Sequence, residues 1–348
     1  MRATRSLELT SASVKARTRR LRVVVETLPS ATFKDALGEL CPDLEQTSRD
    51  VLGVLAEPTS VPKRNVLVMH GDEPVLATTL RARHGAWEVA TATCVPTLPI
   101  PHRPGMLRTT LSVLGADVLV PEYFGDTHDF PSDEVEPFDV FVADLTDGSL
   151  EGYWRSTGLL ADARRTARKT ESLHITVDKA EALTWMIDTW ETNWKDDPAD
   201  ETGAADDLRT VWPELVRGGA VRVIALADDD GRHVAAASFG VHDGSAIALV
   251  TIRDHAWPLK GGSLGTRIAV ETITFAREAG LARFDLGGYH DYKRRIAPPD
   301  GVRVTLRVGP AVVPHPLGRR VRGLLRPAVR PLRSFARGAA SLTEARAS

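Results

Sequence analysis

The sequence predicts an α+β protein made of two tandem lobes, each a mixed, mostly antiparallel sheet flanked by helices, with a basic helical tail at the C-terminus. Three observations lead to this fold class. Short apolar runs separated by tight turns form two meanders, at residues 64–92 and 221–253. Segments with helical spacing surround the second meander. Arginines then recur among apolar residues through 315–348.

The bulk composition is that of a globular protein. Of the 348 residues 43% are hydrophobic and 26% are charged, which allows a sizeable core. No apolar stretch approaches the ~20 residues needed to cross a bilayer, and the N-terminus lacks the apolar run of a secretory signal. We therefore expect a cytoplasmic protein without an integral membrane segment. Cys41 and Cys94 are too few for a disulfide framework or a zinc site, so we expect two buried thiols and no metal.

The two ends of the chain are basic, and the body between them is acidic. Residues 1–22 and 315–348 together hold 15 of the 44 basic residues and 2 of the 46 acidic residues, which leaves the body with a net charge of −15. We divide the chain into a basic arm (1–22), an N-terminal lobe (23–150), a C-terminal lobe (151–314) and a basic amphipathic tail (315–348). We expect the tail to pack on the acidic body, with peripheral contact to a membrane surface or to nucleic acid as the alternatives.

The N-terminal lobe is predicted to be strand-rich. Strands are expected at 21–28, 65–69, 75–83 and 87–92, and further ones at 111–114, 117–121 and 139–143. The segment 94–104 is crowded with prolines, which donate no backbone hydrogen bond, so we expect it to be a connection.

The C-terminal lobe is predicted to alternate between helices and a second meander. Helices are expected at 158–169, 179–194 and 208–217, followed by strands at 221–227, 233–241 and 246–253. A glycine-rich loop then opens a helix over 266–279, and residues 282–286 form the next strand.

The strongest functional signal is the loop Lys260-Gly-Gly-Ser-Leu-Gly265, which stands between a strand and a helix N-terminus. Unpaired backbone N–H groups at the start of a helix favour an anion such as a pyrophosphate. Glycines let a ligand approach the backbone, and Lys260 adds positive charge. The loop lacks both the early βαβ placement of a dinucleotide fold and the Gly-Lys-Ser/Thr ending of a P-loop. An ordinary loop into a helix is the alternative.

A meander that leads into such a loop and helix resembles the acyl-CoA site of the GNAT acetyltransferases. In that family an Arg/Gln-x-x-Gly-x-Gly/Ala loop holds the CoA pyrophosphate, and a splayed strand accepts the pantetheine arm. The loop here matches the basic first place and the last glycine, with Ser263 at the fourth place. The later segment Phe284-Asp-Leu-Gly-Gly-Tyr-His-Asp-Tyr-Lys293 resembles the Fem-like and cellulose-cluster acetyltransferase-like branch, whose strand ends in Asp-x-x-Gly before Tyr/Phe-Lys.

The resemblance implies two tandem GNAT-like lobes that use acyl-CoA as a co-substrate, with no permanently bound cofactor. The residues expected to contact the donor are Ala248, Leu249, Val250, Lys260, Gly261, Gly262, Ser263, Leu264, Gly265 and Thr266. The backbone N–H groups at 248–250 are also candidates for contact with the thioester oxyanion.

The candidate catalytic residues are Tyr289, His290, Asp291, Tyr292 and Lys293. His290 or Asp291 could deprotonate the amine, and either tyrosine could protonate the departing thiolate. By the resemblance, Lys293 would lie between the lobes and bind an anionic group or the reacting carbonyl. Each role has a structural alternative. The tyrosines could serve packing, and the basic run that starts at Lys293 could be a solvated surface.

Two other interpretations concern residues near these candidates. We expect Asp285 to order the turn at Gly287-Gly288 rather than to act as a base. The tryptophans at 185, 190 and 194 are expected to belong to the core rather than to an acceptor platform.

The expected function is therefore N-acyl transfer from acyl-CoA to the amine of a small metabolite, an amino sugar or an amino-acid-like acceptor. One alternative is a Fem-type aminoacyl transferase that uses aminoacyl-tRNA, for which the basic ends would form a docking surface. The absence of a long heptad segment favours acyl-CoA over tRNA. Another alternative is a GNAT-like binding protein without catalytic activity.

Overall fold

The computed structural model describes residues 5–9, 21–44, 46–59, 61–83, 86–91, 98–123, 125–146, 148–194, 204–242, 244–257, 263–287 and 293–310. Within these ranges, 13 strands form one sheet in the order β1-β2-β3-β4-β5-β6-β13-β7-β12-β11-β10-β9-β8. The basic tail at 315–348 and most of the basic N-terminal arm lie outside the described residues.

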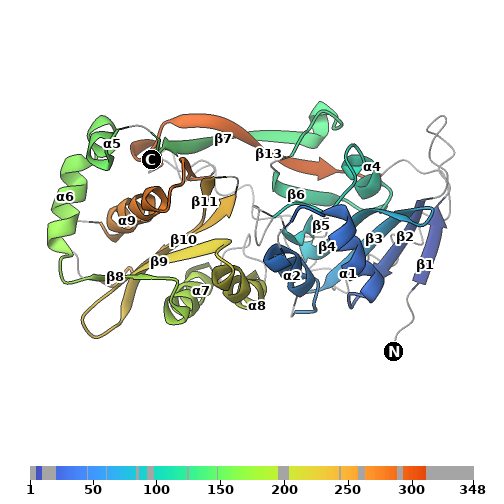
Figure 1. Cartoon of the computed structure of the whole chain (residues 1–348), viewed down its shortest axis with the longest axis horizontal. Coiled ribbons are helices and arrows are strands. Elements are labelled where there is room, and N and C mark those ends of the chain that lie inside the picture. Colours follow the sequence, from blue (N-terminus) through green and yellow to red (C-terminus); the bar gives the residue numbers. More distant parts are fainter. Residues whose placement is uncertain are drawn as a thin grey trace, which may run out of the picture.

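The right-hand half of Figure 1 holds the elements up to β6. They are β1 Arg5–Leu9, β2 Leu21–Glu26, α1 Ala31–Leu40, α2 Gln46–Leu55, β3 Lys63–His70, β4 Glu73–Arg83, β5 Ala86–Val89, α4 Leu107–Ser112 and β6 Val118–Tyr123.

The remaining elements follow from residue 132 onward, and most of them make up the left-hand half of Figure 1. The strands are β7 Val135–Asp144, β8 His174–Val177, β9 Val221–Ala227, β10 His233–His242, β11 Ser245–Arg253, β12 Arg283–Asp285 and β13 Pro299–Val308. The helices are α5 Leu150–Ser156, α6 Leu160–Lys169, α7 Ala180–Trp194, α8 Ala204–Arg217 and α9 Leu264–Glu278, with short 3-10 turns η1 Ser132–Glu134 and η2 Lys293–Arg295.

The two halves of the sheet repeat one topology. In each, an antiparallel meander ends in a strand that pairs in parallel with the next strand along the chain. β5 pairs in parallel with β6, and β11 with β12, whereas the other strand pairs are antiparallel. A parallel pair requires a crossover, which α4 supplies in the first lobe and α9 in the second. The predicted α+β fold with two lobes, each a mixed, mostly antiparallel sheet flanked by helices, is confirmed.

Two long strands join the lobes at the centre of the sheet. β13, from near the end of the described chain, pairs with β6 on one side and with β7 on the other. The C-terminal part of β7 pairs in turn with β12. Figure 1 shows β7 and β13 running across the top of the molecule from one lobe toward the other. The sheet therefore continues through the boundary that the sequence places near residue 150.

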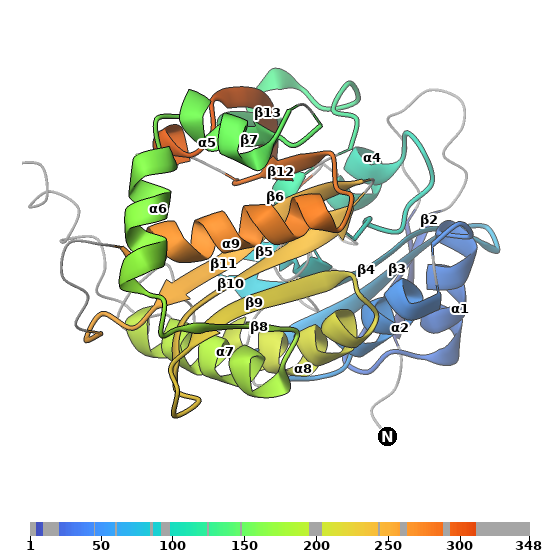
Figure 2. The ribbon, with the colours of Figure 1, turned by 60° about the vertical axis from the view of Figure 1, so that its left-hand side comes forward.

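The apolar core also spans the two lobes. One cluster contains buried side chains of α1 and α2 from the first lobe together with those of α7, α8, β9 and β10 from the second. Two further clusters lie one under α4, with side chains of β13 among its members, and one under α5, α6 and α9, with side chains of β7 among its members. In Figure 2, α9 crosses one face of β10 and β11, while α7 and α8 lie along the lower side of the same sheet. Trp185 and Trp190 pack against the shared cluster, in agreement with the interpretation as core residues.

One predicted strand is wrong. The apolar run at 111–114 is predicted to be a strand, but it belongs to α4 and to the turn that follows this helix. Leu107, Leu111 and Leu114 are all buried and are spaced four and three residues apart, which is the period of a helix face. The apolar run taken alone hides this spacing, because its helical partner Leu107 lies outside it. Gly115, at φ 69°, then ends the helical course.

No helix among the described ranges combines the length and the apolar character that crossing a bilayer requires.

The shared cluster makes a prediction about stability. Trp212 of α8 is 2% exposed within that cluster. Replacing it in Trp212→Ala should lower the free energy of unfolding by about 3–5 kcal/mol, because the cavity lies where the helices of both lobes meet. Urea unfolding measures the loss. The control Leu28→Ala removes a side chain that is 62% exposed and should stay within about 0.5 kcal/mol of the parent. Equal effects of the two changes would contradict the shared core.

Candidate functional site

The C-terminal lobe contains a wedge between β11 and β12. The two strands pair only at Ser245 with Arg283, Ala246 with Phe284 and Ile247 with Asp285. Beyond the last of these pairs β11 continues to Arg253, whereas β12 has ended. The part of β11 that begins at Ala248 is therefore free of β12, as the resemblance requires of a strand that accepts the donor.

A β-bulge distorts β11 at the mouth of this wedge. Ala248 pairs with Phe239 and Val250 pairs with Ser238, so Leu249 is the extra residue. The N–H group of Val250 donates to the hydroxyl oxygen of Ser238 at 3.2 Å. Of the three predicted oxyanion donors, the Val250 amide thus already has a protein acceptor, while the bulge turns Leu249 out of the regular ladder.

The N-terminus of α9 follows β11. Ser263 is its N-cap, and the Ser263 hydroxyl accepts from the Thr266 N–H at 3.2 Å. The amides of Leu264 and Gly265, in the first turn, have no partner within the helix. A Cβ placed on Gly265 would lie 3.8 Å from Nη1 of Arg253, so an arginine side chain stands at the positive end of the helix dipole. Two positive features converge there, which favours an anion.

Several predicted site residues fall outside the described residues. They are Lys260, Gly261 and Gly262 of the loop and the catalytic candidates Tyr289, His290, Asp291 and Tyr292. Cys94 also lies outside them. The catalytic candidate that the structure places is Lys293, at the start of η2.

Lys293 lies among charged groups from both lobes. Burial lowers the pKa of its ammonium group and Arg303 lowers it further, while Glu122 and Asp285 act in the opposite direction. A Cβ on Gly287 would lie 3.6 Å from the Lys293 Nζ, which places the amine beside the end of β12. Glu122 comes from β6 and Asp285 from β12, so the lysine lies between the lobes.

Arg303 is the centre of this charged cluster. It is 4% exposed and comes from β13, the strand that joins the lobes. Its guanidinium forms ion pairs with Glu122 and with Asp285, and its Nε lies 3.0 Å from Asp285 Oδ2. The cluster Glu122, Arg303, Asp285 and Lys293 therefore connects β6 to β12 across the centre of the sheet.

Asp285 also orders the turn after β12. Its Oδ1 accepts from the Gly287 N–H at 2.7 Å, and Gly287 has φ 77°, a conformation that favours glycine. The interpretation of Asp285 as the residue that orders this turn is confirmed.

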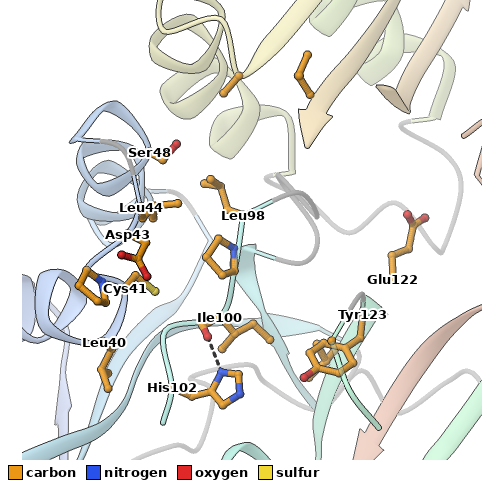
Figure 3. A pocket seen from close by; sticks show the side chains of 16 residues that line it. Leu40, Cys41, Asp43, Leu44, Ser48, Leu98, Ile100, His102, Glu122 and Tyr123 are labelled. Atoms are coloured by element: carbon orange, nitrogen blue, oxygen red, sulfur yellow. Dashed lines mark hydrogen bonds between the residues drawn. The ribbon is translucent and has the colours of Figure 1, made fainter. Parts of the chain in front are cut away.

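Two cavities flank the charged cluster. The larger, of about 540 Å³, lies between the α1–α2 turn, residues 98–102 and β6, and Glu122 forms part of its wall. Figure 3 shows Cys41, Leu98 and His102 around it, with Glu122 on the side away from Cys41. The smaller, of about 280 Å³, includes Asp285 and Arg303. The sequence predicts a buried thiol at Cys41, but the structure has a free thiol that is only partly buried. Cys41 is partly exposed because it follows the last turn of α1 on the cavity wall.

Sequence reasoning missed Glu122, Arg253 and Arg303. Arg253 could have been found, because it is the last residue of the strand that leads into the glycine-rich loop. Glu122 and Arg303 are 181 positions apart along the chain, and only the pairing of β13 with β6 brings them together. Among the described residues, no three histidine, cysteine or acidic side chains gather as a metal ion would require.

The second lobe matches a known protein family, and most of the chain is similar to solved structures. Residues 159–294 match the family model of the acetyltransferase (GNAT) domain. L-PGS from Bacillus licheniformis is 13% identical, with a TM-score of 0.52 over 86% of this chain and 98% of that one. A tandem GNAT protein from the clavulanic acid biosynthesis pathway is 14% identical, with a TM-score of 0.48 over 84% and 99%. FemX is 10% identical, with a TM-score of 0.41 over 76% and 95%.

No curated protein sequence matches the chain significantly. At these identities the structural likeness concerns the fold alone.

The charged cluster yields a prediction with a control on the same strand. Arg303→Met should lower the free energy of unfolding by about 3–5 kcal/mol, because two carboxylates lose a buried partner. Arg307 also pairs with a glutamate, but its side chain is 58% exposed and that of Glu136 is 60% exposed. Arg307→Met should therefore change the stability by less than about 1 kcal/mol. Chemical denaturation of the two variants checks this, and a small loss for Arg303→Met would show that the cluster does not hold the lobes.

Proposed function

We propose that this chain, which belongs to the GNAT superfamily, is an N-acyltransferase that moves an acyl group from acyl-CoA to the amine of a small acceptor. The observation that carries the proposal is the wedge between β11 and β12, which opens toward the capped N-terminus of α9 and Arg253. This arrangement offers one open strand for the pantetheine arm and an electropositive end for the diphosphate. We also propose that the chain is related to the Fem-like branch of this superfamily.

The chemistry assigned to each element follows from its position. The first-turn amides of α9 and the guanidinium of Arg253 bind the diphosphate. The bulged backbone at Leu249 approaches the thioester carbonyl. Lys293, half-buried between the lobes, donates to the oxygen of that carbonyl as negative charge develops on it. The acceptor ammonium first loses a proton to water, and the neutral amine attacks the carbonyl carbon. The carbon–sulfur bond then breaks, and the proton that the nitrogen loses on forming the amide ends on the departing thiolate.

Gly265 provides a test of donor binding that is separate from folding. A Cβ at this position would lie 3.5 Å from the Ser263 Oγ and 3.8 Å from Arg253, which are ordinary contacts. Gly265→Ala should therefore keep or slightly raise the melting temperature, since alanine favours a helix by about 1 kcal/mol over glycine. The added methyl group should weaken CoA binding by about tenfold or more, because it occupies the approach to the first-turn amides.

Calorimetric titration with CoA and acetyl-CoA measures the binding. Gly38→Ala in α1, where a Cβ would meet nothing within 4 Å, is the matched control and should bind CoA like the parent. No binding of any CoA ester to the parent protein would contradict the proposed donor, and binding of aminoacyl-tRNA instead would favour the Fem-type alternative.

The second test concerns the protonation of Lys293. Burial lowers its pKa, so the charged form is lost at a lower pH than the usual value of 10.5. If the charged form stabilises the oxyanion, kcat should fall on the alkaline side, below pH 10.5. Lys293→Arg should move this fall to higher pH, because a guanidinium stays charged, and Lys293→Met should lower kcat by about 10²-fold or more.

Thiol release with a weakly basic amine measures this profile without a contribution from the titration of the acceptor. A rate that keeps rising through the alkaline range, and is abolished in Lys293→Arg, would instead make Lys293 the base that deprotonates the amine.

A further inference from the structure

The larger cavity occupies the wedge of the first lobe. β5 pairs in parallel with β6 only at Trp87 with Val118 and Glu88 with Leu119. Beyond β5 a different segment continues along β4, because the Ala77 N–H donates to the Pro101 carbonyl and Leu76 forms a bridge with His102. This segment and the end of β6 are opposite walls of the cavity. The cavity thus repeats, in the first lobe, the position of the donor wedge in the second.

The first-lobe wedge lacks the features that would hold a diphosphate. The helix that follows it, α4, has only 6 residues, and its N-cap Met106 makes no side-chain hydrogen bond. The lining side chains include the carboxylates of Asp43 and Glu122 but no lysine or arginine from the described part of the chain. A phosphorylated ligand would meet the carboxylates of Asp43 and Glu122 there, and Arg303, the ion-pair partner of Glu122, is not part of the wall.

We propose that this cavity binds the acceptor, and that the acceptor is an amine with an apolar body and without a phosphate group. This inference rests on the proposed acyl transfer. A volume of about 540 Å³ suits a small organic molecule. Most of the wall is aliphatic, with Leu40, Leu44, Leu98, Ile100, Val120 and Val241 among the lining residues.

Hydrogen-bonding groups in the wall select an ammonium group rather than a carboxylate. Nδ1 of His102 lies 2.6 Å from the Ile100 carbonyl oxygen and donates to it, so that Nε2 of the neutral ring is an acceptor. Burial raises the pKa of the Tyr123 hydroxyl, and the charges of Asp126 and Asp129 raise it further. The charged side chains of the wall, Asp43 and Glu122, are both acidic, and Arg303 pairs with Glu122 from outside the wall.

Glu122 links the cavity to the reacting centre. It forms part of the cavity wall, pairs with Arg303, and contributes to the electrostatic environment of Lys293. An ammonium group held at Glu122 would stand on the first-lobe side of the charged cluster, with β12 and the donor wedge on the other side. The two wedges would thus deliver the two substrates from opposite lobes to one cluster.

Cys41 reports on occupancy of the cavity without turnover. It lines the cavity and is a free thiol, and burial raises its pKa. The full chain, without any CoA ester, is alkylated with iodoacetamide at fixed pH, and peptide mass spectrometry measures the rate at Cys41. Saturating hexylamine should slow this alkylation by about fivefold or more, because a ligand excludes the reagent in proportion to its occupancy. Hexanoate, of the same length and opposite charge, should have little effect, and free CoA should have none.

Two variants test the charge selection. Glu122→Gln should weaken protection by hexylamine about tenfold, since a charge-assisted hydrogen bond is lost. Asp43→Asn, at an exposed turn with little risk to folding, should weaken it less but in the same direction. Equal protection by hexanoate, or protection by CoA, would overturn the proposal. So would amine-dependent thiol release from acyl-CoA with unchanged Cys41 reactivity, and that outcome would leave the acyl transfer itself intact.

Discussion

The arrangement of this protein depends on one buried arginine. Arg303 comes from the strand that joins the lobes, and it satisfies carboxylates from β6 of the first lobe and β12 of the second. Without that partner the two carboxylates would repel each other, and that of Asp285, whose side chain is 15% exposed, would lack most of the solvation that water supplies. The guanidinium therefore fixes the spacing of the strands that border the two wedges. Lys293 owes its position between these groups, and the lowered pKa of its amine, to the same enclosure.

Local patterns in the sequence predicted most of the C-terminal lobe. The helices at α6, α7, α8 and α9 and the strands β9, β10 and β11 begin and end within a few residues of the predicted limits, because each has a clear period and a turn at its end. The N-terminal lobe was predicted less completely. The sequence predicts neither β1 nor the helices α1 and α2, and it predicts a strand at the end of α4, since a short amphipathic helix and a short strand give similar apolar runs. In the later part of the chain it predicts none of α5, β8 and β13.

The site was predicted from the sequence only where its residues follow one another along the chain. The loop before α9 and the segment that ends at Lys293 are such cases. Glu122, Arg303 and the cavity wall could not be predicted in this way, because their residues lie far apart along the chain. A carboxylate at a strand end carries no local signal, and only the pairing of β13 with β6 brings Arg303 to Glu122. The repeat of the wedge in the two lobes is likewise a property of strand pairing. It leaves no visible repeat in the residues themselves.

The place of β13 has a consequence for how the chain folds. This strand, at residues 299–308, fills the gap between β6 and β7, both of which are synthesised long before it. Until it arrives, the edge of β6 presents unpaired backbone groups, which are a template for pairing with another chain. The first lobe cannot finish its sheet while it emerges from the ribosome, although domains generally fold in the order of synthesis. Completion of the first lobe is thereby a late event, and the charged cluster around Arg303 forms only when that event has occurred.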